Sequence, residues 1–77
     1  MRMSKASQAD RILEYMRQFG SITPLEAVRD LGVLRLAARI SDLRKAGYDI
    51  ISEQHAVENR FGETCYVAKY SERREEI

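Results

Sequence analysis

Hydrophobic residues recur every three or four positions through residues 8–46, and the pattern then changes to stretches rich in β-branched and aromatic residues. The first pattern is typical of helices that bury one face, and the second is typical of strands. We therefore predict helices over residues 8–19, 24–31 and 34–46 and strands over residues 48–53 and 64–70. A two-stranded hairpin alone is marginal in water, so it must pack against the helices. The pattern predicts an α+β domain.

Two of the predicted helices begin at sequences that are typical of helix starts. Ser7 and Asp10 have the spacing of a capping box, although Asp is shorter than the usual Glu or Gln. Thr23 and Glu26 have the same spacing, and Pro24 occupies the first helical position, where proline is tolerated. In chain order, the three helices are expected to bury Ala9, Ile12, Leu13, Met16 and Phe19, then Leu25, Val28 and Leu31, then Val33, Leu36, Ala37, Ile40 and Leu43.

The two predicted strands are separated by a long connection, so we expect them to extend partway into it. Its tip is expected at residues 59–62, which end in a glycine that suits a turn. The link at residues 21–23 is either a plain connector or a one-rung strand. Cys65 is expected to be at least half-buried as a small apolar residue. The tyrosines Tyr48, Tyr66 and Tyr70 are expected to pack in the hairpin and the core.

A length of 77 residues allows one domain, because it is too short for two hydrophobic cores. We expect a flexible N-terminal arm at residues 1–6, the folded domain at residues 7–70 and a charged C-terminal tail at residues 71–77. A single cysteine rules out an intramolecular disulfide framework and favours a cytoplasmic protein. There is no apolar run of membrane-spanning length, so no membrane association is expected.

Several kinds of chemistry leave no trace in the sequence. Cys65 and His55 are the only residues of their types, and together they cannot build a zinc site. There is no glycine-rich phosphate loop and no nucleophile with a base at a recognised spacing. We therefore expect no enzyme activity, no cofactor and no small-molecule substrate.

Charge is balanced over the whole chain but not along it. The chain has 13 basic and 12 acidic residues, which gives a net charge of +1. Residues 33–46 hold four basic side chains and one acidic one, so 4 − 1 gives +3, whereas residues 51–77 hold four basic and six acidic ones, so 4 − 6 gives −2. The basic charge therefore gathers on the third predicted helix, which is where a nucleic-acid reader needs it.

Three helices followed by a hairpin is the plan of a winged helix-turn-helix, in which the third helix enters the major groove of double-stranded DNA and the hairpin forms a wing. The start of the second helix, at Thr23, is expected to offer free amides to a phosphate. The outward face of the third helix and the wing tip supply the other candidate DNA contacts: Leu34, Arg35, Ala38, Arg39, Ser41, Asp42, Lys45, Asn59 and Arg60.

Three stretches of the chain resemble a family of small winged helix-turn-helix domains that are common in phage and prophage genomes. They are Leu36–Ile50, with its Arg-Ile-x-Asp-Leu-Arg-x-x-Gly core, the tip Asn59–Gly62 and the closing Tyr66–Tyr70. The likeness covers about residues 8–70. It implies a DNA-binding role, often in phage gene control. This wing departs from a strong phosphate clamp, because it carries Glu53, Glu58 and Glu63.

Individual candidates have different expected roles. Arg35, near the start of the third helix, suits a guanine, whereas Lys45 at the far end suits a phosphate. Arg39 either reaches a phosphate or bridges to Glu26 or Asp30 on the second helix. Leu34 contacts either a thymine methyl or a protein, and Asp42 either accepts a hydrogen bond from cytosine or pairs with a neighbouring Arg or Lys. At the wing tip, Arg60 either contacts a phosphate or is a plain loop residue. Phe61 either folds back on the core or inserts into a partner.

Two functions follow from these observations. The first is a DNA-binding phage or prophage regulator, or an accessory factor in DNA transactions, which acts as a homodimer or with a protein partner because one such module binds weakly alone. The second is a winged-helix module that docks on a host or phage protein without binding DNA.

Overall fold

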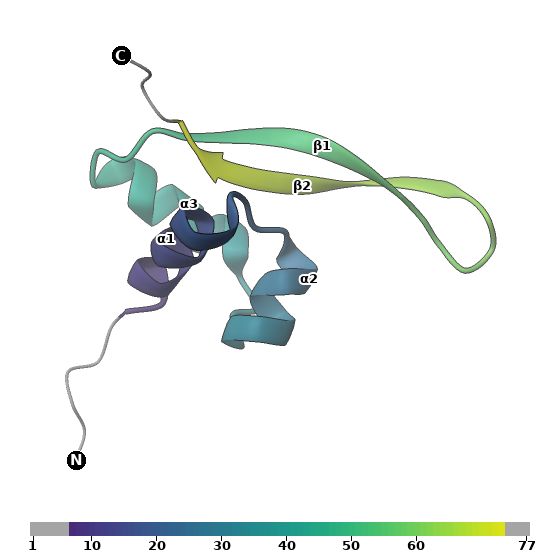
Figure 1. Cartoon of the computed structure of the whole chain (residues 1–77), viewed down its shortest axis with the longest axis horizontal. Coiled ribbons are helices and arrows are strands. Elements are labelled where there is room, and N and C mark those ends of the chain that lie inside the picture. Colours follow the sequence, from purple (N-terminus) through teal and green to yellow (C-terminus); the bar gives the residue numbers. More distant parts are fainter. Residues whose placement is uncertain (1–6, 74–77) are drawn as a thin grey trace.

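The computed structural model describes residues 7–73, and Figure 1 shows the helices packed beneath a long β-hairpin. The elements, in chain order, are α1 (Gln8–Phe19), α2 (Pro24–Glu26), η1 (Ala27–Leu31), α3 (Leu36–Lys45), β1 (Ile50–Glu58) and β2 (Thr64–Glu72). This is the predicted α+β plan, with the second helix divided into α2 and the π-helical η1. The predicted arm at residues 1–6 and residues 74–77 of the predicted tail lie outside the described residues.

Helix α1 has the predicted bounds, and its first turn is closed by the predicted capping box. The Ser7 hydroxyl accepts the N–H of Asp10 at 3.1 Å, and the Asp10 carboxylate accepts the N–H of Ser7 at 3.4 Å. The inward face is largely buried as predicted, but Phe19 is 63% exposed. Its ring lies at the end of the helix and packs on Tyr15 instead, with the ring centroids 4.7 Å apart.

The second helix begins at its predicted cap and then changes helix type. The Thr23 N–H donates to the Glu26 carboxylate at 3.0 Å, and the Glu26 N–H donates to the Thr23 hydroxyl at 3.3 Å. In the π-helix η1 the hydrogen bonds span five residues rather than four, so the usual helical spacing does not define its inner face. The predicted burial of Val28 is therefore wrong, since it is 43% exposed, whereas Ala27 is fully buried. The predicted burial of Leu25, which lies in α2 before η1, is also wrong, since it is 70% exposed.

The turn before α3 is longer than predicted. Gly32 ends η1 with a φ of 68°, and the chain then buries Val33 before it re-enters a helix. Helix α3 consequently begins at Leu36, two residues after the predicted start, and both Leu34 and Arg35 precede it. The helix buries Leu36, Ile40 and Leu43 as predicted, but Ala37, also predicted to face inward, is exposed.

Strands β1 and β2 pair in antiparallel fashion along their whole length, from Ile50 opposite Glu72 to Glu58 opposite Thr64. They extend into the connection as predicted, and the turn lies at the predicted tip. The hairpin projects past the helices (Figure 1). Its outer part is therefore exposed, and the expected burial of Cys65 and Tyr66 is wrong.

The folded domain continues past the predicted boundary at residue 70. Ser71 lies opposite Ile51 in the ladder, and β2 ends only at Glu72. The Arg17 guanidinium of α1 donates to both oxygens of the Glu72 carboxylate, at 2.8 and 3.0 Å. The first residues of the predicted tail are thus held against α1, because an arginine fork matches a carboxylate.

Ile22 joins the hairpin to the helices. Its N–H and C=O exchange hydrogen bonds with Tyr70 at 2.8 and 2.9 Å, so the one-rung strand is the alternative that the structure shows. The Ile22 side chain is also fully buried. The core lies between the helices and the base of the hairpin and comprises Ile12, Leu13, Met16, Ile22, Ala27, Val33, Leu36, Ile40, Leu43 and Ile50.

We predict that Ile40→Ala lowers the free energy of unfolding by about 2–5 kcal/mol, because it leaves a cavity in a packed core. Ile40 is 1% exposed. The matched control is Leu34→Ala, which removes a side chain that is 81% exposed and should change stability by less than ~0.5 kcal/mol. Urea denaturation measures both, and equal losses would contradict this description of the core.

Candidate nucleic-acid interface

The start of α3 lies beside the start of α2 and the base of the hairpin. A depression of about 330 Å³ is lined there by Pro24, Tyr70 and the consecutive residues from Leu34 to Ala38. Leu34 and Arg35 are both exposed. The structure therefore brings together three predicted site residues, Leu34, Arg35 and Ala38, and adds the exposed methyl group of Ala37, which the predicted helix phase had placed in the core.

Two arginines of α3 already have partners within the protein. The Arg39 Nε lies 3.1 Å from the Asp42 carboxylate, in an ion pair that lacks the alignment of a hydrogen bond. The alternative in which Arg39 bridges to the second helix is wrong, because the acidic residues there have other partners. Arg44 turns toward the hairpin, where its guanidinium donates twice to the Ile50 carbonyl, at 3.1 and 2.8 Å.

Arg35 and Lys45 are left as the exposed cations at the two ends of α3. Within residues 7–73, neither side chain has a hydrogen-bond or ion-pair partner. They are ten residues apart, which corresponds to about 15 Å along a helix axis. Ser41 is exposed between them and is small enough to let a partner approach closely. This surface can hold two negative groups at a separation fixed by the helix.

The start of α2 offers fewer free amides than we expected. The N–H groups of Thr23 and Glu26 are both used in the capping box and Pro24 has no N–H, so the N–H of Leu25 is the one left in the first turn. The Glu26 carboxylate also brings a negative charge to this end of α2. The Thr23 hydroxyl accepts one hydrogen bond and keeps its own proton available as a donor.

The wing tip is organised by the side chain of Asn59. Its carbonyl oxygen accepts the N–H groups of Phe61 and Glu63 at 2.9 and 3.0 Å, and its amide donates to the Glu63 carboxylate at 3.1 Å. Gly62 completes the turn: its φ is 81°, and its N–H donates to the backbone carbonyl of Asn59. Asn59 therefore builds the tip, and its side chain is committed to the loop.

Two exposed side chains remain at the tip. Arg60 has no hydrogen-bond or ion-pair partner within the described part of the chain, and Phe61 is 80% exposed, so it does not fold back on the core. Glu58 and Glu63 lie on either side of the turn. The tip thus presents one cation and one aromatic ring, with a glutamate on each side.

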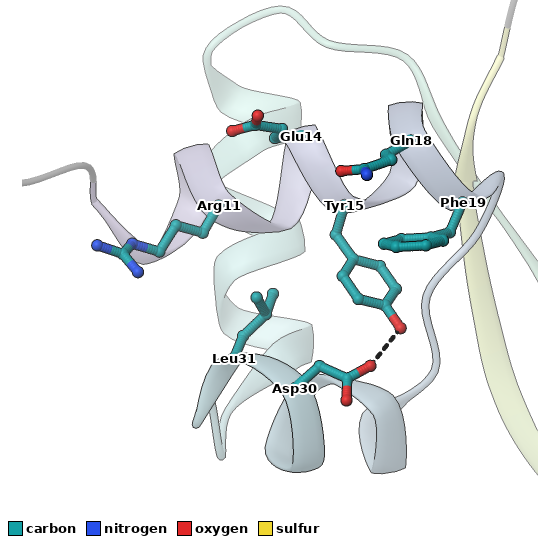
Figure 2. Close-up of a pocket in the computed structure, with 7 residues that line it drawn as sticks. All are labelled: Arg11, Glu14, Tyr15, Gln18, Phe19, Asp30 and Leu31. Atoms are coloured by element: carbon teal, nitrogen blue, oxygen red, sulfur yellow. Dashed lines mark hydrogen bonds between the residues drawn. The ribbon is translucent and has the colours of Figure 1, made fainter.

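A second hollow, for which the sequence held no local signal, lies between α1 and η1 and has a volume of about 500 Å³. The Tyr15 hydroxyl donates to the Asp30 carboxylate at 2.6 Å across a separation of 15 residues (Figure 2). The hollow is lined by Arg11, Glu14, Tyr15, Gln18, Phe19, Asp30 and Leu31.

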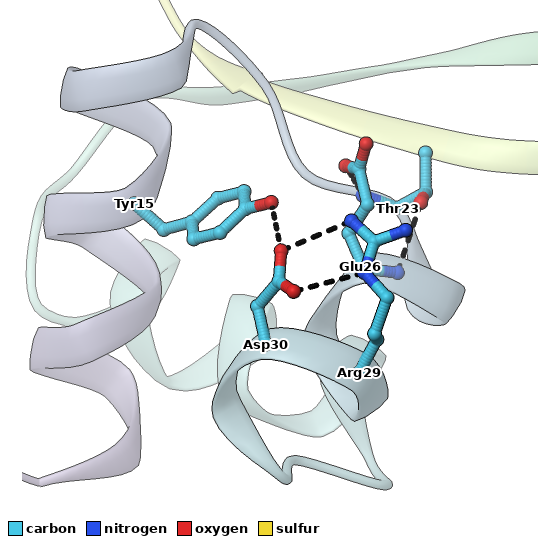
Figure 3. Close-up of polar contacts among 5 residues, drawn as sticks. All are labelled: Tyr15, Thr23, Glu26, Arg29 and Asp30. Carbon is cyan, nitrogen blue, oxygen red and sulfur yellow. Dashed lines mark hydrogen bonds and ion pairs between the residues drawn. The ribbon is translucent and has the colours of Figure 1, made fainter.

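Asp30 is held by two donors at once. The Arg29 guanidinium donates to its two oxygens at 2.9 and 3.1 Å, alongside the bond from Tyr15 (Figure 3). The hydrogen bond from Arg29 is the main cause that lowers the pKa of Asp30 to about 2, and the bond from Tyr15 adds to it. The same contact with Asp30 raises the pKa of the Tyr15 hydroxyl. This network joins η1 to α1 at a distance from the start of α3.

Residues 7–73 contain no group of three or more His, Cys, Asp and Glu side chains placed to hold a metal ion. None of the helices in that range combines the length and the apolar character that crossing a membrane requires.

The fold and this surface define a winged helix-turn-helix domain: three helices, a turn that leads into an exposed third helix and a hairpin wing. The family model described as a winged helix-turn-helix domain matches residues 7–72, so the chain belongs to this family. No curated protein and no solved structure shows a significant match to the chain.

We predict that Asp30→Asn destabilises the domain at neutral pH and that this difference disappears in acid. Because the pKa of Asp30 is lowered from 3.8 to about 2 in the folded state, its contribution is present above pH 3.8 and is lost as the pH falls through about 2. Denaturation of both proteins between pH 7 and acid tests the difference, and a carboxylate NMR titration gives the midpoint. A difference that persists unchanged below the folded pKa would contradict the proposed charge contacts.

Proposed function

We propose that the chain is a DNA-binding protein in which α3 and the preceding turn enter the major groove of double-stranded DNA. One observation carries the proposal: Arg35 and Lys45 are exposed at the two ends of α3 and have no partner among the described residues, whereas Arg39 and Arg44 are engaged inside the domain. Membership of the winged helix-turn-helix family supports it, since many such domains bind DNA through this helix.

The proposed contacts differ in kind. Arg35 reads a guanine edge, and Lys45 holds a phosphate at the other end of the helix. Leu34 lies beside Arg35 and contacts a thymine methyl. The small side chains Ala38 and Ser41 permit close approach.

The remaining candidates have weaker roles. Asp42 and Arg39 neutralise one another, so together they contribute orientation rather than net charge. Thr23 donates only through its hydroxyl. Asn59 shapes the wing tip, and Arg60 supplies its phosphate contact.

The biological role that we propose is control of transcription, or assistance in a DNA transaction, in a phage or prophage setting within the cytoplasm. This proposal assigns the chain no catalytic step and no cofactor. A single module of this size buries roughly 600–1,000 Å² on DNA and binds weakly. Two copies acting together, or one copy with a protein partner, therefore form the proposed binding unit.

A second function has its own support in two exposed apolar residues. Leu34 is 81% exposed and Phe61 is 80% exposed, the two highest fractions among the large hydrophobic side chains of residues 7–73. In this alternative the wing and the start of α3 dock on a host or phage protein without binding DNA.

We predict that Arg35→Ala combined with Lys45→Ala abolishes detectable duplex binding and leaves the fold intact. The parent protein is first used to select its site from random duplexes at low salt. Its log affinity is then measured against log salt, and a slope of about −2 to −4 is expected for two to four phosphate contacts. Circular dichroism and thermal unfolding verify the fold of the variant.

The matched control is Arg11→Ala combined with Arg73→Ala, which removes the same net charge from surfaces away from the start of α3. Arg73 is in an exposed ion pair with Asp49, and such pairs contribute little stability. If both double variants bind duplex DNA as well as the parent, α3 does not read DNA. If the parent retains no duplex but binds one specific protein, the second function replaces the first.

We predict a smaller and sequence-independent effect for Arg60→Ala. Loss of one phosphate contact at the wing tip should reduce the steepness of the salt dependence by about 1 without changing which sequence is preferred. Fluorescence anisotropy on the selected duplex and on a scrambled duplex measures both quantities. A changed sequence preference would show that the tip reads bases, and an unchanged slope would remove the wing from the interface.

A further inference from the structure

Strand β1 has one edge that no strand covers. The sheet contains β1 and β2 only, and within residues 7–73 the single additional bridge joins Ile22 to β2. Residues 52–58 of β1 are all exposed. An exposed edge of this length is a template for pairing with another strand, and proteins usually cover, shorten or interrupt it.

Three backbone hydrogen bonds show which backbone groups of β1 face this edge. Asn59 donates its N–H across the hairpin to Glu63, and Tyr70 turns its N–H and C=O away from β1 toward Ile22. Tyr70 lies opposite Ser52. Because successive residues of a strand point their backbone groups to opposite sides, the outer edge presents the groups of Ser52 and the alternate residues that follow it, Gln54, Ala56 and Glu58.

The edge ends at Ile50, because the Arg44 guanidinium already occupies the carbonyl of that residue. The usable stretch therefore starts at Ser52 and runs toward the tip. It contains no proline, and the register of β1 with β2 has no bulge. These features leave side-chain charge as the main control over what pairs with it.

The stretch is complementary to itself in one antiparallel register. When Gln54 lies opposite Gln54 of a second copy, Ser52 lies opposite Ala56 of that copy. By symmetry Ala56 also lies opposite Ser52 of the second copy, so three pairs each exchange two backbone hydrogen bonds, and 3 × 2 gives six bonds. On the alternate positions Glu53 lies opposite His55 of the second copy, where its carboxylate accepts a hydrogen bond from the imidazole, and Ile51 lies opposite Val57 of that copy.

Two neighbouring registers keep the same hydrogen-bonding parity. A shift toward the tip places Ser52 opposite Glu58 and so adds a fourth pair of backbone partners, but it sets His55 against His55 and Glu53 against Val57 and loses both carboxylate–imidazole contacts. A shift toward the base places Glu53 against Glu53, and like charges directly opposite are destabilising. The side chains therefore favour the register centred on Gln54 over these two.

We propose that two copies of this chain associate through the outer edges of their β1 strands, centred on Gln54, to form a four-stranded antiparallel sheet. This gives a specific surface to the pair of copies in the proposed function. The pairing itself involves no DNA and is testable without it.

The test is sedimentation of the full chain, without DNA, as a function of concentration. The variant Gln54→Pro removes an N–H that faces the outer edge, so it spares the ladder between β1 and β2, where edge prolines are tolerated. It should raise the dimer dissociation constant at least ~10-fold, since two symmetric hydrogen bonds are lost. The control Gln54→Ala keeps the N–H and should change the constant less than ~3-fold by the same reasoning.

Charge exchange tests the register. Glu53→Lys alone and His55→Glu alone should each weaken the dimer, because each places unfavourable partners opposite one another twice. The double variant carrying both changes restores opposite charges at both positions and should restore association. Failure of the double variant to recover, with an intact hairpin by circular dichroism, would overturn the register.

Crosslinking provides an independent readout. With Cys65→Ser as background, Gln54→Cys should form an intermolecular disulfide on mild oxidation, because directly opposite Cα atoms about 5.5 Å apart fit disulfide geometry. Glu53→Cys should crosslink much less. A chain that stays monomeric up to ~1 mM overturns the proposal outright. Duplex binding is measured separately, so loss of DNA binding with intact self-association would reject only the proposed function.

Discussion

The arrangement of the domain depends on the paired hydrogen bonds between Ile22 and Tyr70. A hairpin with two strands has too little buried surface to persist alone. Ile22 pairs with β2 as a third strand of one residue, and its side chain is fully buried in the core against the helices. The bidentate contact of Arg17 with Glu72 adds a second link at the base, and the Arg17 guanidinium also lies over the ring of Tyr48, 5.8 Å from its centroid. The outer part of the wing can therefore project into solvent because its base is held from two sides.

The use of charge explains how a nearly neutral chain acquires a basic surface. Many acidic side chains are engaged by local partners: Asp10 and Glu26 close capping boxes, Asp30 receives Arg29 and Tyr15, and Asp42 pairs with Arg39. Each of these contacts also positions an element. Among the described residues, the exposed side chains of Arg35 and Lys45 at the ends of α3 have no such partner. Net charge alone is therefore a poor guide to the partner of a small domain, because local pairing decides which charges remain available.

Local signals in the sequence predicted most of the fold. The capping residues at Ser7 and Thr23 placed two helix starts, and the β-branched and aromatic residues after residue 48 placed the hairpin, because both signals act over a few residues. The start of α3 was misplaced, since the burial of Val33 lengthens the turn, and that burial depends on tertiary packing. The π-helix of η1 changed which residues face inward, and no cap or period signals this change in helix type.

The candidate site was predictable only in outline. The outward position of Lys45 on the third helix followed from periodicity, whereas Arg35, predicted on the same helix, precedes its first turn. The partner of Arg39 did not, because three acidic residues were within plausible reach and only the packed arrangement chooses between them. The contact of Tyr15 with Asp30 joins two helices far apart in the chain, so neither residue carried a signal by itself.

The double hydrogen bond from Arg44 to the Ile50 carbonyl has a mechanical consequence. It fastens the last turn of α3 to the first residue of β1, so the helix and the wing rotate together. The tip lies about 27 Å from Ile50, eight residues along an extended strand. With that lever arm, a rotation of about 10° at the helix sweeps the tip through about 5 Å. A small change in the angle between α3 and a partner therefore moves the wing tip by several ångströms. Helix α3 and the wing consequently have to match a target together, as one rigid shape.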